Sequence, residues 1–248
     1  MKSALTMWNN TRMIILVAVC AAIYGSALIA FKTVIPLIPG YTEVRVANVF
    51  PMVLSLLFGP AGAWGSAIGN FIGDLFGGTL GPGSLPGFVG NFILGYLPYS
   101  LWTTLLPGLG LSREWTPGSW LNWANYILIA FISSAACAVL VSTGVDAMGM
   151  VPYSVLSKII ALNNTLCSLI GVILLASVFN ITKHQLGLFW ADLLDEKDVH
   201  VSSKAVAGAW IVTAASAIGL FGAMVTGLQP AAVGWLCSFG IIVGSILL

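Results

Sequence analysis

Two polar side chains four residues apart interrupt an apolar, glycine-rich stretch of the chain. Asn70 and Asp74 lie in Gly69-Asn70-Phe71-Ile72-Gly73-Asp74, and a spacing of four places both side chains on one face of a helix. An ionisable residue in a membrane segment is costly and usually faces a cavity or a partner. We therefore expect Asn70 and Asp74 to face a binding site. The alternative for Asp74 is a cap or loop residue, because Gly77-Gly78 follows within a turn.

Three other charged residues interrupt or border apolar segments. Lys158 lies inside one of them, where a cation is as costly as Asp74. Glu43 and Arg45 stand at a segment boundary, where a side chain reaches water at low cost. They are either interface anchors or contacts to a bound solute.

Several asparagines add amide groups in other apolar segments: Asn48, Asn91, Asn163 and Asn164. An amide donates and accepts hydrogen bonds, which suits a heterocycle that carries both kinds of edge. The alternative is hydrogen bonding between helices, a common use of Asn in membranes. We interpret the set as the lining of a substrate site, with these predicted substrate-binding residues: Glu43, Arg45, Asn48, Asn70, Asp74, Asn91, Lys158 and Asn163.

The composition identifies an integral membrane protein. Of 248 residues, 58% are hydrophobic and 7% charged, whereas soluble domains carry about 25% charged residues. The net charge of +1 leaves no basic stripe for a nucleic-acid partner. The four cysteines lie in apolar runs and are expected to be small buried residues, neither a disulfide set nor a metal site.

No set of residues in the sequence predicts catalysis, and we expect neither an enzyme nor a cofactor. No Ser, His and acid fall at one membrane depth, because both histidines lie in one polar loop. The acidic cluster after residue 190 is better explained as a solvated connector than as a metal site. No phosphate-binding glycine loop with a following Lys and Ser/Thr is present, so the chain does not hydrolyse ATP by that route.

Eight apolar runs predict an all-α fold with eight membrane segments: 13–31, 47–58, 63–77, 88–106, 120–141, 153–181, 205–228 and 230–248. The second run is barely long enough to cross, and Gly59-Pro60-Ala61-Gly62 predicts a sharp turn after it. We divide the chain into a six-helix substrate-binding domain (1–181), a cytoplasmic connector (182–204) and an additional helical hairpin (205–248).

The basic residues predict that both termini are cytoplasmic. With the N-terminus inside, the inner loops contain Lys2, Arg12, Arg113, Lys183, Lys197 and Lys204, and the outer loops contain Lys32 and Arg45. Several tryptophans then gather near the inner interface. The outer connections 32–46, 78–87 and 142–152 are the ones expected to cover a ligand.

Two rows of small residues predict close helix packing. The small-residue stripe in the first segment consists of Ala18, Ala22, Ser26 and Ala30, at a spacing of four. The glycine row in the third segment has the same spacing: Gly65, Gly69, Gly73 and Gly77. The alternative for the stripe is an alanine-rich helix with chance spacing.

Residues 13–181 resemble the substrate-binding S components of energy-coupling factor (ECF) vitamin transporters. The resemblance lies in Ala18 and Ala22, in Val46-Ala47-Asn48-Val49-Phe50-Pro51-Met52-Val53, in Leu56-Leu57-Phe58-Gly59-Pro60-Ala61-Gly62, and in the Gly69–Asp74 stretch. It implies a six-helix membrane protein that captures a micronutrient outside. The opening Val-Arg-Val-x-Asn is also similar to the branch associated with queuosine precursors.

The resemblance also implies partners, namely a transmembrane coupling subunit and two ATPase subunits. In that family the small-residue stripe of the first helix contacts the coupling subunit, which corresponds here to Ala18, Ala22 and Ser26. The connection 32–46 would form a lid over the ligand. The chain departs from the family pattern after residue 204, where two further helices are expected.

Two other functions remain open. A stand-alone secondary carrier or channel would use Asp74 and Lys158 as an ion or proton relay. A membrane scaffold or enzyme would use the glycines for assembly alone. The identity of a substrate does not follow from the residues, because amides, charges and aromatic rings accommodate many small polar molecules.

Overall fold

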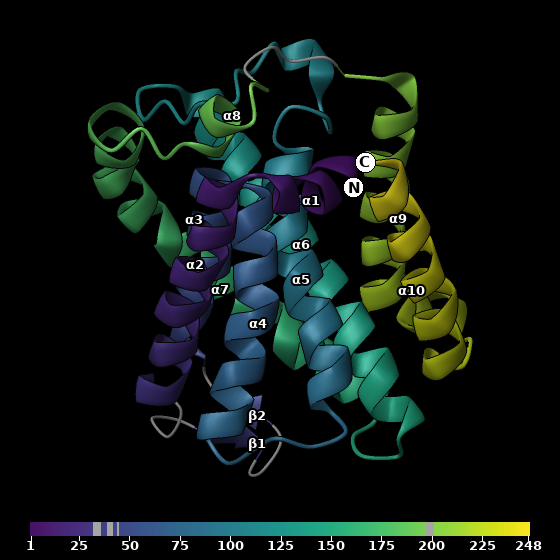
Figure 1. The fold of residues 1–248 in the computed structure, drawn as a ribbon. Coiled ribbons are helices and arrows are strands. Elements are labelled where there is room, and N and C mark those ends of the chain that lie inside the picture. Colours follow the sequence, from purple (N-terminus) through teal and green to yellow (C-terminus); the bar gives the residue numbers. More distant parts are fainter. Residues whose placement is uncertain (32–35, 39–41, 44, 197–200) are drawn as a thin grey trace.

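The computed structural model describes residues 1–31, 36–38, 42–43, 45–196 and 201–248 of the chain. Its principal helices run alternately in opposite directions, so the N- and C-termini lie at the same end of the bundle (Figure 1). They are α2 (Thr11–Phe31), α3 (Val49–Phe58), α4 (Pro60–Phe76), α5 (Ser84–Leu101), α6 (Trp120–Ala147), α7 (Tyr153–Asn180), α9 (Ser203–Thr226) and α10 (Pro230–Leu247). Each predicted apolar run corresponds to one of these helices, and the predicted all-α fold is confirmed.

Shorter elements lie at the two ends of the bundle. The terminal end carries α1 (Lys2–Thr6), η1 (Met7–Asn9), η3 (Pro107–Leu109), the π-helical η4 (Ile181–Gln185) and α8 (Trp190–Leu193). The opposite end, which we call the hairpin end, carries β1 (Pro36–Ile38), β2 (Thr42–Glu43) and η2 (Val46–Asn48). The two strands pair antiparallel where the sequence predicted a loop. The rest of that predicted lid, residues 32–35, 39–41 and 44, lies outside the described residues.

Within the part of the chain that the structure describes, five helical stretches are long and apolar enough to cross a membrane: Thr11–Phe31, Trp120–Ala147, Tyr153–Leu193, Ser203–Thr226 and Pro230–Leu247. The chain is therefore a multi-pass membrane protein. Helix α3, with 10 residues, is shorter than the roughly 20 residues that span a bilayer. Residues 51–57 of α3 are all buried, so this short helix lies among its neighbours and not against lipid.

The predicted packing role of the glycine row is confirmed between α2 and α4. A Cβ at Gly69 would lie 3.0 Å from the Ala21 carbonyl oxygen, and a Cβ at Gly73 would lie 2.9 Å from the Cβ of Leu28. A side chain at either position would therefore push the two helices apart. The glycines thus fix how deeply α2 packs into the bundle.

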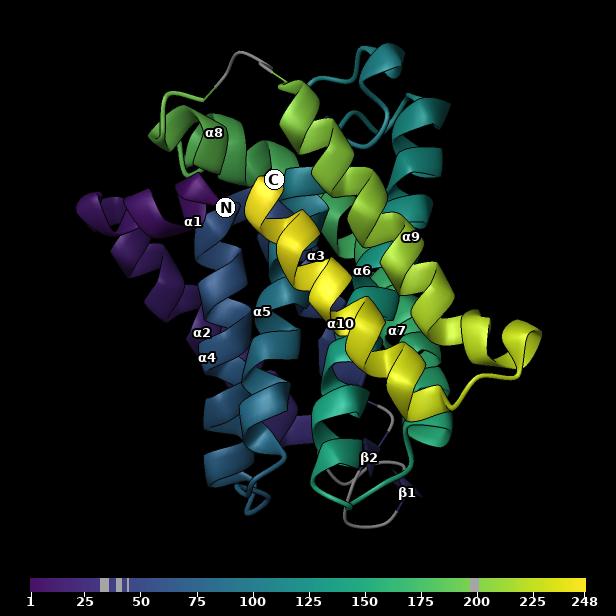
Figure 2. The same cartoon turned by 90° about the vertical axis from the view of Figure 1, so that its right-hand side faces the viewer.

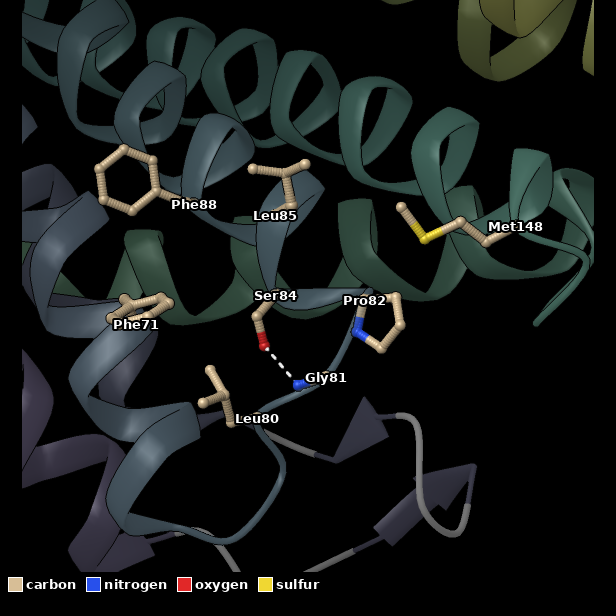
Figure 3. A pocket seen from close by; sticks show the side chains of 8 residues that line it. All are labelled: Phe71, Leu80, Gly81, Pro82, Ser84, Leu85, Phe88 and Met148. Carbon is tan, nitrogen blue, oxygen red and sulfur yellow. Dashed lines mark hydrogen bonds between the residues drawn. The ribbon is translucent and has the colours of Figure 1, made fainter.

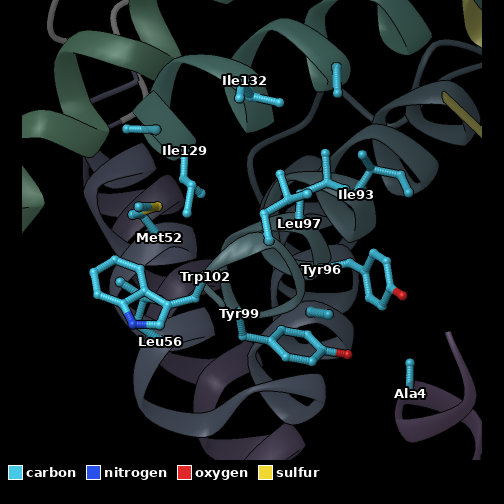
Figure 4. Packing of buried hydrophobic residues seen from close by; sticks show 14 of the residues in the cluster. Ala4, Met52, Leu56, Ile93, Tyr96, Leu97, Tyr99, Trp102, Ile129 and Ile132 are labelled. Carbon is cyan, nitrogen blue, oxygen red and sulfur yellow. The ribbon is translucent and has the colours of Figure 1, made fainter. Parts of the chain in front are cut away.

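Aromatic side chains fill the terminal end of the bundle. Figure 4 shows Tyr96, Tyr99 and Trp102 of the α5 region among aliphatic residues of α3 and α6. The Tyr99 and Trp190 rings are 5.1 Å apart in an edge-to-face contact. Trp64 lies 5.6 Å from Trp8. Trp115 also lies 6.0 Å from Trp102 and 5.3 Å from Trp123, so tryptophans do cluster; that they lie at the inner membrane interface stays a prediction.

Part of the predicted connector after α7 packs against the bundle. Phe189 and Trp190 are buried, and a Cβ at Gly59 would lie 2.6 Å from the Trp190 ring. Gly59 has φ +53°, a conformation that glycine adopts without strain. The Phe58-Gly59-Pro60 turn therefore packs directly beneath the indole. Charged residues flank this apolar contact, and Arg113 lies 4.9 Å from the Trp190 ring centroid.

The C-terminal hairpin packs along the six-helix part of the chain (Figure 2). The Tyr153 hydroxyl donates to the Gly219 carbonyl at 2.8 Å, and the Tyr96 hydroxyl donates to the Ser245 carbonyl at 3.2 Å. Helix α6 also continues to Ala147, past the predicted end at 141. Asp146 at its end accepts a hydrogen bond from the Tyr153 backbone N–H at 3.0 Å.

Candidate substrate site

The first polar chain at the hairpin end joins the connection before η2 to the end of α4. Arg45 donates from Nη1 to Asn70 Oδ1 at 3.1 Å. Asn70 donates from Nδ2 to Asp74 Oδ2 at 3.4 Å, and Thr79 donates from Oγ1 to Asp74 Oδ1 at the same distance. Asn70 is buried and Asp74 half-buried. The one-turn spacing of Asn70 and Asp74 along α4 makes this contact possible.

A second polar network lies deeper, among α2, η2, α5, α6 and α7. The buried Tyr24 hydroxyl lies 2.7 Å from Asn48 Oδ1 and 2.9 Å from Asn91 Oδ1. Asn48 donates from Nδ2 to Asn164 Oδ1 at 2.5 Å. Asn164 in turn lies 3.5 Å from Cys137 Sγ. All of these residues are buried, and buried amides require hydrogen-bond partners.

The helix ends explain why these side chains meet. Asn48 lies where η2 passes into α3, so it enters the bundle from the hairpin end. Asn91 lies two turns into α5 and donates to the Gly87 carbonyl at 2.9 Å. A Cβ at Gly87 would lie 3.2 Å from Asn70 Nδ2. This glycine therefore lets the start of α5 approach α4 beside the first polar chain.

The structure brings most of the predicted site residues into these two networks, but not all. Asn163 is buried on α7 and accepts a weak contact from the Cys167 thiol at 3.8 Å. Lys158 is exposed on α7 and belongs to neither network. Glu43 lies in β2, and its side chain lies outside the described part of the structure. The roles of all eight residues in binding stay predictions.

The small-residue stripe lies on the outer face of α2. Ala18, Ala22 and Ser26 are exposed, whereas Ala21 and Gly25 are buried. The two faces therefore have different neighbours, and the stripe remains accessible to another helix.

Two members of the deeper network, Tyr24 and Cys137, were missed by sequence reasoning. Tyr24 is a large side chain with a hydroxyl in a mostly aliphatic segment, and it lies on the face opposite the small-residue stripe. That combination was a usable signal. Cys137 gave none, because a buried Cys in an apolar run usually serves as a small apolar residue.

A separate apolar pocket of about 500 Å³ opens at the hairpin end, between α4, α5 and the end of α6 (Figure 3). Its lining residues are Phe71, Leu80, Gly81, Pro82, Ser84, Leu85, Phe88 and Met148. Ser84 accepts a hydrogen bond from the Gly81 backbone N–H at 3.3 Å. Among the described side chains, none of the predicted site residues lines this pocket, so the polar networks and the pocket are distinct features.

The arrangement is suited to reversible binding. It supplies a cation, a carboxylate, several amides and a hydroxyl at one end of a membrane bundle. Groups of these types can donate and accept hydrogen bonds at the polar edges of a small molecule.

Comparison with known proteins assigns the chain to a family. The family model described as "QueT transporter" matches residues 14–180, more than half of the chain. No curated protein and no solved structure matches the sequence. The matched range contains both polar networks and ends before the connector and the C-terminal hairpin. The chain belongs to the QueT transporter family of ECF S components, a family associated with queuosine precursors, and is a membrane subunit for substrate uptake.

Proposed function

We propose that this chain captures a queuosine precursor at the outer membrane face and passes it to an ATP-driven ECF module. The partners are a transmembrane coupling subunit and two ATPase subunits. Residues 1–181 form the binding domain, residues 182–204 a cytoplasmic connector and residues 205–248 an accessory hairpin. Both termini are cytoplasmic. The opposite end of the bundle, which carries β1, β2 and η2, therefore lies outside.

The observation that supports this proposal most directly is the convergence of the polar residues at one end. Arg45, Asn70 and Asp74 form one hydrogen-bonded chain, and Asn48 and Asn91 meet at Tyr24. Queuosine precursors are 7-deazaguanine bases, whose edges contain donors and acceptors. Amides and charged groups complement such edges.

A binding titration tests the substrate. The purified protein in detergent is titrated with 7-aminomethyl-7-deazaguanine, and tryptophan fluorescence or calorimetry gives the Kd. We expect Arg45→Ala to raise this Kd about tenfold or more, because hydrogen bonds to charged groups contribute about 1.5–3 kcal/mol. Arg12→Ala is the matched control, since Arg12 is exposed at the terminal end. An unchanged Kd in Arg45→Ala would remove Arg45 from the site.

A transport assay tests the coupling. We expect an ATPase pair to co-purify with the chain, and uptake into liposomes to require those ATPases and ATP. Uptake by the pure chain, driven by a proton gradient, would instead establish a stand-alone carrier.

A further inference from the structure

The Tyr24 hydroxyl lies near two hydrogen-bond acceptors but has one proton to donate. It lies within hydrogen-bond distance of the side-chain oxygens of Asn48 and Asn91, yet a hydroxyl donates once. When the proton points to Asn48, the Asn91 oxygen receives none from Tyr24. A buried acceptor without a donor is destabilising, so the choice of acceptor matters.

This choice is coupled to the orientation of the neighbouring amides. Turning an amide by 180° exchanges its oxygen and nitrogen at nearly the same positions. If Asn48 and Asn164 both turn, the Cys137 thiol donates to Asn164, Asn164 to Asn48, and Asn48 to the Tyr24 oxygen. The Tyr24 proton then goes to Asn91, which keeps its own bond to the Gly87 carbonyl. Every member is satisfied in this second arrangement.

The two arrangements present different groups to a bound molecule. Each amide nitrogen has two N–H donors, and each amide oxygen has two lone pairs, while the contacts within the network use only part of them. Reversing Asn48 and Asn164 exchanges a donor for an acceptor at each position. A molecule that contacts these amides therefore favours one of the two arrangements of donors and acceptors.

We propose that Tyr24 is a positioning residue for substrate specificity. Its single proton couples the donor and acceptor orientations of the Asn48 and Asn164 amides to the hydrogen bond with Asn91, and thereby selects which hydrogen-bonding edge of a base the site accepts. This inference rests on the proposed function, since it requires a base bound at these amides.

The test compares two bases that differ at one edge. 7-Deazaguanine presents a carbonyl acceptor and a ring N–H donor, whereas 2,6-diamino-7-deazapurine presents an amino donor and a ring nitrogen acceptor. The ratio of their two Kd values is measured for wild type, for Tyr24→Phe and for Tyr153→Phe. The last variant is the matched control, because it also loses one buried hydroxyl bond, to the Gly219 carbonyl at 2.8 Å, outside the network.

We expect Tyr24→Phe to change the ratio about tenfold, the effect of one neutral hydrogen bond of about 1.4 kcal/mol. Tyr153→Phe leaves the ratio unchanged. A second variant, Asn91→Ala, leaves Asn48 as the acceptor for the Tyr24 hydroxyl. We expect it to change the ratio of the two Kd values as well. If Tyr24→Phe weakens the binding of both bases equally, the role of Tyr24 is merely structural and the inference is overturned. An unchanged ratio of the two Kd values in folded Tyr24→Phe or folded Asn91→Ala also overturns it. A wild-type protein that binds neither base refutes the proposed function, and this inference with it.

Discussion

Substitution of one glycine between α2 and α4 is expected to disturb the substrate site from outside it. A Cβ at Gly69 would lie 3.0 Å from the Ala21 oxygen, 3.0 Å from Tyr24 Cδ1 and 3.1 Å from the Gly25 nitrogen. Two of these atoms belong to the α2 backbone, and the third belongs to the ring whose hydroxyl contacts Asn48 and Asn91. Gly69→Ala therefore pushes on both α2 and Tyr24.

The expected displacement follows from contact distances. Carbon atoms pack best at about 3.5–4.0 Å, so relief of a 3.0 Å contact moves the Tyr24 ring by about 0.5 Å. Its hydroxyl contacts of 2.7 and 2.9 Å then lengthen toward about 3.3 Å, where hydrogen bonds weaken. Overpacking costs about 1–3 kcal/mol, and the helix preference of Ala over Gly offsets about 1 kcal/mol. Net loss of stability is thus at most about 2 kcal/mol.

The assay measures substrate Kd and thermal unfolding of the same detergent preparations. We expect Gly69→Ala to fold, to unfold a few degrees lower than wild type, and to bind 7-aminomethyl-7-deazaguanine several-fold more weakly. Gly222→Ala is the control, because its Cβ meets chiefly the Ile218 side chain of the same helix, at 2.9 Å. It gains the same helix preference without a backbone clash. Wild-type affinity in a folded Gly69→Ala protein would refute the link between α2–α4 spacing and the site.

Three further substitutions test separate parts of the molecule. Asn70→Ala removes the residue between Arg45 and Asp74, and we expect the Kd to rise about tenfold in the same titration, with little change in unfolding temperature. Ala22→Leu adds bulk to the exposed stripe of α2, so we expect co-purification of the coupling subunit to fall while the Kd stays constant. Trp190→Ala removes the indole that packs against Gly59 and Tyr99, and calorimetry is expected to show a loss of roughly 3–5 kcal/mol in unfolding free energy.

The helices and the relative placement of several site residues followed from the sequence. Hydrophobic runs located the principal helices, and their alternation in direction placed the residues before α3 at the same end as the end of α4. The Arg45–Asn70 contact at 3.1 Å agrees with that placement. A spacing of four was sufficient to predict that Asn70 and Asp74 share a face.

The rest depends on contacts that local patterns do not encode. Lys158 interrupts an apolar run, yet only the rotation of α7 in the bundle leaves it exposed. Trp190 follows a polar loop, and its burial requires the distant Phe58-Gly59-Pro60 turn to lie beneath it. Tyr24 belongs to the deeper polar network because two amides from other elements lie within hydrogen-bond distance of its hydroxyl. Such partners are set by tertiary packing and not by sequence spacing.

Helix α2 connects the proposed partner surface to the proposed substrate site without any intermediate element. Its outer face exposes Ala18, Ala22 and Ser26, and its inner face places Tyr24 against Asn48. A coupling subunit that docks on the stripe and shifts α2 by about 0.5 Å would stretch the Tyr24 contacts as far as Gly69→Ala does. If that displacement weakens substrate binding, Gly69→Ala in the isolated subunit should reproduce part of the effect of the coupling subunit. Its Kd should then be higher than that of the isolated wild type. Measuring the Kd with and without the coupling subunit, in wild type and in Gly69→Ala, decides this, because two effects through the same contacts are expected to be less than additive.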